Sequence, residues 1–67
     1  MNGMELRGEM VKQGYTAKKL AKSIGIGQKA MSEKLSGKSD FKQSEIKKIS
    51  SVLNLTNDQI IAIFFAA

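Results

Sequence analysis

The chain has 67 residues, enough for one small domain. It contains no cysteine and no histidine, which excludes a disulfide framework, thiolate chemistry, zinc sites of the usual kind and imidazole general bases. The formal net charge is +5, and the segment from Lys12 to Lys48 carries ten basic residues against three acidic ones, a distribution that favours a polyanionic partner. The apolar end, residues 60–67, is shorter than the ~20 residues of a membrane span, and the first ten residues lack the apolar stretch of a signal peptide. We therefore expect a cytoplasmic protein with no membrane contact.

Apolar residues recur at helical spacing along the chain, and β-branched residues never alternate over four or more positions. This pattern predicts an all-α fold, a compact bundle of five helices at about residues 4–13, 17–24, 28–36, 43–53 and 57–66. Glycines follow the first three helices, and Thr16 and Thr56 are suited to cap the second and the fifth. No linker or repeat interrupts the series, so residues 1–67 are predicted to form a single domain.

Residues 16–37 carry the most specific pattern of the chain. Two apolar stripes lie on two short helices: Leu20, Ala21 and Ile24, then Met31 and Leu35. Gly25 between them can adopt the left-handed backbone of a tight turn, and the small Ala21 lets the helices approach each other. The spacing predicts a helix-turn-helix over about residues 17–36, a motif whose second helix enters the DNA major groove.

The outward side of the third predicted helix carries the candidate readers of DNA bases. With Met31 inward, polar side chains point the opposite way; the candidates are Gln28, Lys29, Ser32 and Glu33. A glutamine amide can pair with adenine, a lysine can donate to guanine, and a glutamate can accept from cytosine. Lys29 and Glu33 are also four residues apart, so they could instead pair with each other.

Candidate phosphate contacts lie on both sides of that helix, where helix N-termini and lysines attract anions. They are Thr16, Ala17 and Lys18 at the start of the second helix, and Lys38, Ser39 and Lys42 after the third. Ala17 could offer only its backbone N–H. For any single lysine, a solvated side chain without a contact is the alternative.

The last predicted helix, residues 57–66, is apolar around most of its circumference. Ile60, Ile63 and Phe64 share the side that would close the core, whereas Ile61 and Phe65 project elsewhere. We expect a dimer or partner interface here, with Ile61, Phe64 and Phe65 as its candidate residues. The alternative is that the exposed pair tucks under the first helix or frays with the terminus.

Four stretches of the chain resemble the Cro and phage-repressor (Xre-like) helix-turn-helix family. They are LRGEMVKQGYT, KKLAKSIGI, MSEKLSGKSDFKQSEIKKISSVLNL and LNLTNDQI. The third is similar to small Cro-like regulators of temperate phages and prophages in Gram-positive bacteria. The resemblance implies a lambda-repressor-like DNA-binding domain and a transcriptional repressor that binds an operator in double-stranded DNA. It also implies a homodimer and a place at the nucleoid of a bacterial host cell.

The chain departs from that family at several positions. Ala17 stands where many members have a glutamine. Lys34 occupies a position that is commonly apolar, and Leu35 one that is commonly polar. The buried stripe of the third helix is therefore predicted to shift by one residue. Lys42 replaces the usual Ser or Thr cap of the fourth helix, which would cost a capping bond.

These departures, the acidic Glu33 and the apolar tail leave a second function open. It is a protein-binding modulator or antirepressor that keeps the fold and holds a separate phage repressor. No serine stands in a nucleophile motif beside a suitable base, so we expect no enzyme, no catalytic residue, no metal and no cofactor.

Overall fold

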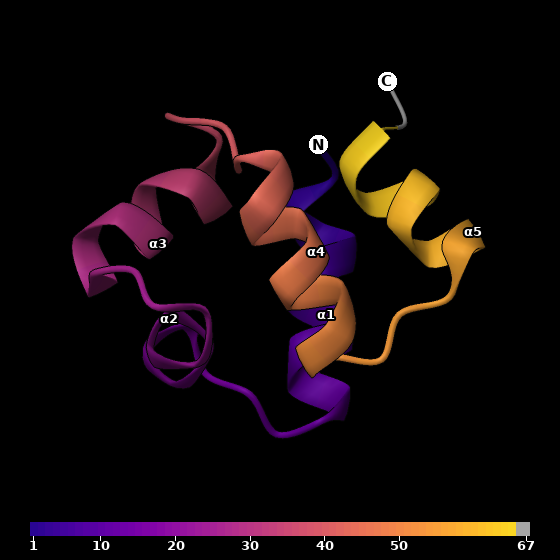
Figure 1. Cartoon of the computed structure of the whole chain (residues 1–67), viewed down its shortest axis with the longest axis horizontal. Helices are drawn as coiled ribbons and strands as arrows, with labels where there is room; N and C mark the ends of the chain where they lie inside the picture. Colours follow the sequence, from indigo (N-terminus) through magenta and orange to yellow (C-terminus); the bar gives the residue numbers. More distant parts are fainter. Residues whose placement is uncertain (66–67) are drawn as a thin grey trace.

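Helices make up most of the part of the chain that the computed structural model describes, residues 1–65. They are α1 (Gly3–Lys12), α2 (Ala17–Ile24), α3 (Gln28–Ser36), α4 (Gln43–Val52) and α5 (Asn57–Ile60), and α5 continues into the π-helical turn η1 (Ile61–Phe65) (Figure 1). No strand occurs within residues 1–65. The predicted all-α chain of five helices is confirmed.

The two predicted threonine caps form at the starts of α2 and α5. Thr16 Oγ1 accepts a hydrogen bond from the Lys19 N–H at 3.1 Å. Thr56 Oγ1 accepts from the Gln59 N–H at 3.1 Å, and the Gln59 side chain accepts from the Thr56 N–H at 2.9 Å. Each cap satisfies a backbone donor that the first turn of a helix leaves without a partner.

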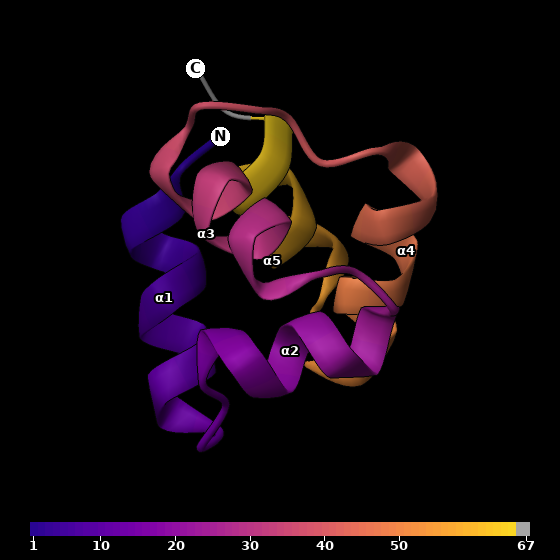
Figure 2. The ribbon, with the colours of Figure 1, turned by 90° about the vertical axis from the view of Figure 1, so that its left-hand side faces the viewer.

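The helices surround one apolar core. The helices α1 and α4 lie on opposite faces of the molecule, α2 runs between their ends, and α3 and α5 lie on opposite sides (Figures 1 and 2). The backbone of α2 packs against α3 and α4, and that of α1 packs against α3 and η1. The buried apolar side chains are Leu6, Met10, Leu20, Ala21, Ile24, Met31, Leu35, Phe41, Ile49, Leu53 and Ile63.

The start of α1 is held between α3 and η1. The Asn2 N–H donates to the Ile63 carbonyl at 2.6 Å. A Cβ placed on Gly3 would lie 2.8 Å from the Leu35 carbonyl oxygen, so only glycine fits this approach without a backbone shift. The two ends of the described chain are therefore joined to each other and to the end of α3.

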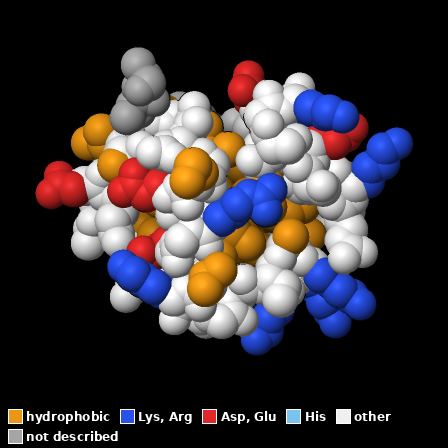
Figure 3. Space-filling view, turned by 180° about the vertical axis from the view of Figure 1, so that it is seen from behind, with side chains coloured by type: hydrophobic (Ala, Val, Ile, Leu, Met, Phe, Trp, Pro, Cys, Tyr) orange, Lys and Arg blue, Asp and Glu red, His pale blue; other side chains and the backbone are white. Residues whose placement is uncertain are grey.

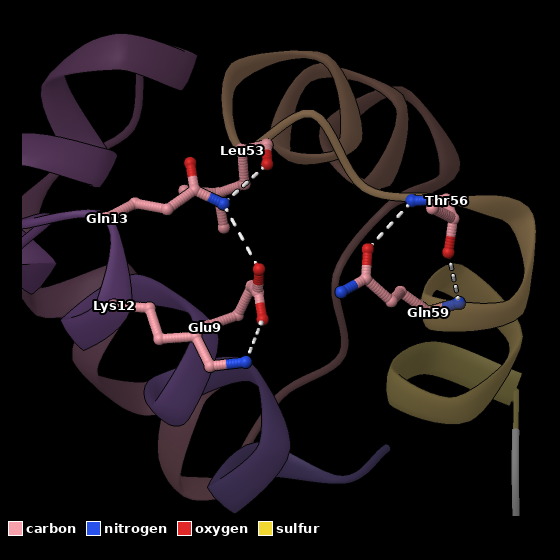
Figure 4. A network of polar contacts seen from close by, with 6 residues as sticks. All are labelled: Glu9, Lys12, Gln13, Leu53, Thr56 and Gln59. Carbon is pink, nitrogen blue, oxygen red and sulfur yellow. Dashed lines mark hydrogen bonds and ion pairs between the residues drawn. The ribbon is translucent and has the colours of Figure 1, made fainter.

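A polar network joins the end of α1 to the end of α4 (Figure 4). Gln13 Nε2 donates to the Leu53 carbonyl at 2.7 Å and to Glu9 Oε1 at 3.2 Å. Glu9 also pairs with Lys12 at 3.7 Å. The carbonyl at the C-terminus of α4 thus finds a donor from a residue forty positions earlier in the chain.

The predicted boundaries need three corrections. The helix α1 begins and ends one residue earlier than expected, and α4 ends at Val52 instead of residue 53. The segment predicted as a regular helix over residues 57–66 is α-helical for one turn only and then π-helical to Phe65; residue 66 lies outside the described residues. We attribute the change to π-helical geometry to the packing of η1 on α1 and to the Asn2–Ile63 hydrogen bond, neither of which the local sequence pattern contains.

The exposure of the side chains on η1 follows the sequence pattern despite the wider turn. Ile63 is buried, Phe64 is half-buried, and Ile61 and Phe65 are exposed. None of the helices within residues 1–65 combines the length and the apolar character that crossing a membrane requires.

Candidate nucleic-acid interface

A tight turn at Gly25 fixes how α2 meets α3. Gly25 has φ 79° and ψ 32°, the left-handed conformation that glycine adopts without strain. The N–H groups of Gly25 and Ile26 both donate to the Ala21 carbonyl, at 2.9 and 3.0 Å. Ala21 is buried and Ile26 is half-buried in the corner. The turn is therefore closed by its own backbone bonds and by small or apolar side chains.

The helix α3 presents a polar side to solvent and an apolar side to the core. Gln28, Lys29 and Ser32 are exposed, and Glu33 is half-exposed. No side chain caps the start of α3 at Gly27. Within residues 1–65 the structure forms no ion pair between Lys29 and Glu33. The exposure of these side chains places all four predicted base readers on the accessible side of α3.

The predicted phosphate contacts lie at the ends of the neighbouring segments. Thr16 and Lys18 at the start of α2 are exposed, and Ala17 is half-buried. Lys38, Ser39 and Lys42, all exposed, belong to the 37–42 loop between α3 and α4. Figure 2 shows α2 and α3 on the near side, with this loop arching above α3.

Charge is unevenly spread over the surface. On the face shown in Figure 3, basic side chains project from the edge that carries α2 and α3, with acidic side chains beside some of them, and further acidic side chains lie nearer the C-terminal helix. The basic edge belongs to the segment in which ten basic residues stand against three acidic ones. Its positive field would attract a polyanion to the side on which α3 lies.

The burial of Lys34 corrects the expected shift of the stripe on α3. Lys34 is only 9% exposed and lies inward beside Met31 and Leu35, so the buried side of α3 widens instead of shifting. Lys34 Nζ donates to Glu45 Oε1 at 2.5 Å and lies 5.8 Å from the centre of the Phe41 ring. A buried lysine requires such a partner.

The Lys42 side chain makes no capping hydrogen bond at the start of α4, so the expected loss of that bond is confirmed. A different bond at this helix start comes from Glu45. Its Oε1 accepts a second hydrogen bond from the Lys42 backbone N–H at 2.8 Å. The carboxylate therefore satisfies a donor at the helix start and places negative charge near the positive end of the helix dipole. Burial by itself would raise the pKa of Glu45, but the bonds from Lys34 and Lys42 and their positive charges outweigh it and hold the pKa below its ordinary value.

Sequence reasoning missed Glu45 as part of this region. Two signals could have identified it. It occupies the third position of its helix, where a carboxylate reaches back to the helix start. Lys34 shares a side of α3 with the apolar Met31 and Leu35, where a lysine needs a partner. Only the fold shows that the two side chains meet.

The C-terminal candidates divide into two groups. Ile61 and Phe65 are 57% and 61% exposed. Phe64 instead packs edge-on against Phe41, with ring centres 5.9 Å apart and planes at 89°. Beside Phe65, a groove of about 300 Å³ is bordered by Ile46 and Lys47 of α4 and by Ile60. Of the three predicted interface residues, Ile61 and Phe65 are therefore the ones that are well exposed.

Within residues 1–65, no group of three or more acidic, cysteine or histidine side chains is arranged to hold a metal ion. A family described as "Protein of unknown function (DUF739)" matches residues 3–67. No curated protein and no solved structure matches the chain. Because the match covers almost the whole sequence, the chain belongs to the DUF739 family.

Proposed function

We propose that the protein is a sequence-specific transcriptional regulator that binds double-stranded DNA, with α2 and α3 as a helix-turn-helix of the lambda-repressor type. One observation carries the proposal: α3 is braced on α2 at Gly25 and turns Gln28, Lys29 and Ser32 to solvent. A helix about 10–12 Å across fits the DNA major groove, which is about 12 Å wide.

The base contacts follow from the side chains in the first turns of α3. Gln28 would pair through its amide with adenine, and Lys29 would donate to guanine O6 or N7. Ser32, one turn further on, would bond to either base, and the half-exposed Glu33 would accept from a cytosine at the edge of the site.

Two sets of donors would hold the DNA backbone on either side of α3. At the start of α2 they are Thr16, Lys18 and the backbone N–H of Ala17; in the 37–42 loop they are Lys38, Ser39 and Lys42. These contacts fix the register of the protein on the duplex, and the lysines among them make binding sensitive to salt. This activity would place the protein at the nucleoid, in the cytoplasm of a bacterial cell.

Ile61 and Phe65 support a homodimer as the DNA-binding form. A homodimer that binds DNA in this way needs two copies of α3 on half-sites about 34 Å apart, one turn of B-DNA. Ile61 and Phe65 are exposed apolar side chains available for its interface. Phe65→Asp is expected to shift a dimer to monomer in sedimentation velocity, because a buried carboxylate opposes association. The matched control is Val11→Asp on α1, at a residue that is 77% exposed. Loss of the dimer in the control alone would assign the interface to α1.

The experiment that tests DNA reading is selection from a random duplex library with the purified protein, followed by titration of the enriched duplex over a range of salt concentrations. We expect one enriched sequence whose binding weakens steeply with salt. No enrichment at low salt would overturn the proposal.

A second function is the binding of a separate phage repressor. The exposed apolar pair Ile61 and Phe65, beside the groove on α4, favours it. Calorimetry with such a repressor, for the wild type and for Phe65→Asp, would test it. The second function predicts binding that Phe65→Asp weakens; no heat of binding to the repressor would overturn it.

A further inference from the structure

The loop that carries three of the phosphate-contact candidates is fixed at both ends. At its start, the N–H groups of Lys38 and Ser39 both lie toward the Glu33 carbonyl of α3, at 2.9 and 3.4 Å. At its end, the Lys42 N–H donates to Glu45 Oε1 at 2.8 Å. Between these points the Phe41 side chain is buried. The exposed side chains of the loop therefore stand on an anchored backbone.

The second anchor returns to α3 through Lys34. Lys34 Nζ donates to the same Glu45 oxygen at 2.5 Å, and the two side chains are 11% and 10% exposed. Glu33 and Lys34 are neighbours on α3, so the interactions form a closed ring: from Glu33 through the 37–42 loop to Lys42, then through Glu45 to Lys34. The backbones of α3 and α4 otherwise approach each other little, since each packs mainly on α2.

We propose that the Lys34–Glu45 pair positions the DNA-binding surface: it holds Lys38, Ser39 and Lys42 in a fixed register with the base-reading side of α3. This inference rests on the proposed function. Base readout and phosphate contact must be satisfied together on a rigid duplex, so a loop held relative to α3 supports both at once. Loss of the pair would let the start of α4 move relative to Gln28 and Lys29.

Lys34 acts in this role without touching DNA. Its charge is compensated by Glu45 inside the protein, so it displaces no counterion from the phosphates. Removal of Lys34 should therefore lower the preference for the selected sequence and leave the salt dependence of binding to an unselected duplex unchanged, because binding there requires no fixed register. A phosphate-contacting lysine would show the reverse pattern.

The test compares Lys34→Met with the wild type, well below the unfolding temperature, on the duplex selected from the random library and on an unselected duplex of equal length. We expect about ten-fold weaker binding to the selected duplex and less than about two-fold to the other, with an unchanged salt slope on the unselected duplex. Lys34→Arg, which keeps the donor and the charge, should restore most of the preference. Glu45→Gln provides a second variant of nearly equal size if Lys34→Met does not fold.

The control for a general loss of stability is Val52→Ala at the far end of α4, where Val52 is half-buried against the core. An equal loss of preference in this control would overturn the inference. A loss shared equally by both duplexes, or a flatter salt slope of Lys34→Met on the unselected duplex, would also overturn it.

A measurement without DNA separates this inference from the proposed function. Amide hydrogen exchange at Lys42 should accelerate about ten-fold in Lys34→Met, because the carboxylate that holds this N–H loses its own anchor. Unchanged exchange at Lys42 would overturn the positioning role even if the wild type reads DNA. Failure of the wild type to bind any duplex would overturn the proposed function, whatever the exchange shows.

Discussion

The α2–α3 unit and the C-terminal segment α5–η1 are both short, but different interactions fix their geometry. In α2–α3, the cap at Thr16 and the turn at Gly25 use bonds between residues at most five positions apart. The segment α5–η1 begins with an equally local cap at Thr56, but its shape beyond Ile60 depends on Asn2 and Phe41.

The two regions also present opposite surfaces. The outer side of α3 is polar, with Gln28, Lys29 and Ser32 exposed, whereas η1 exposes the large apolar side chains of Ile61 and Phe65. A polar side on a locally braced helix suits the reading of base edges, which requires hydrogen-bond donors and acceptors at fixed positions. An exposed apolar pair suits association with another protein surface. Under the proposed function, readout would belong to α3 and assembly to η1.

The largest effect should come from removing the side chain that anchors η1 in the core. Ile63 is 1% exposed, so Ile63→Ala is expected to lower the free energy of unfolding by about 2–5 kcal/mol, through lost burial and the cavity that remains. Urea denaturation followed by circular dichroism would measure it. A loss of that size would show that the C-terminal segment is part of the cooperative fold.

The matched control is Ile61→Ala, two residues earlier, where the side chain is 57% exposed. Its expected cost is below about 0.5 kcal/mol, as for most surface substitutions. If both variants unfolded at the same urea concentration as the wild type, η1 would not be packed as described and the contrast between the two regions would fail.

A smaller effect is expected at the readout end. Gln28→Ala should weaken binding to the selected duplex by about 1–3 kcal/mol and relax the preference at one base pair, because one bidentate contact is lost. The unfolding midpoint should stay close to that of the wild type, since Gln28 is exposed. Titration with duplexes changed at single positions would measure both quantities, and an unchanged base preference would remove Gln28 from the readers.

The same contrast explains how far the sequence could predict the structure. The bounds of α2 and α3 are those expected residue for residue, because Thr16, Gly25 and Gly37 define the helix ends through local backbone chemistry. The bonds within η1 could not be predicted in this way, because this turn also bonds to Asn2, sixty-one residues before Ile63.

The candidate site shows the same limit. The exposure of Gln28, Lys29 and Ser32 follows from the period of the helix once Met31 is placed inward. The burial of Lys34 does not follow from the helical period, because a lysine at the edge of an apolar stripe can turn to solvent. It is buried here because a carboxylate in the interior pairs with it. That carboxylate belongs to Glu45, eleven residues away on another helix.

Acid should weaken the link between α3 and α4 through Glu45. The bonds and charges of Lys34 and Lys42 hold the pKa of Glu45 below its value in the unfolded chain. The resulting stability is fully present above the unfolded pKa and is lost as the pH falls through the folded pKa. The difference in free energy of unfolding between the wild type and Glu45→Gln should therefore be smaller at about pH 3 than at about pH 7. A constant difference would show that the charge of Glu45 stabilises nothing.

The smallest expected effect concerns a single exposed lysine of the readout end. Lys38 lies in the anchored loop next to α3, so Lys38→Ala should weaken binding to selected and unselected duplexes alike and reduce the salt slope by about one unit, the loss of one neutralised phosphate. Lys12→Ala provides the control, because Lys12 is also exposed but pairs with Glu9 and belongs to α1. If both variants reduced the salt slope by the same amount, the basic residues would act through their total charge, and Lys38 would make no specific contact with a phosphate. If only Lys38→Ala reduces the salt slope, the phosphate contact lies in the 37–42 loop, which the ring of Glu33, Lys42, Glu45 and Lys34 holds in place.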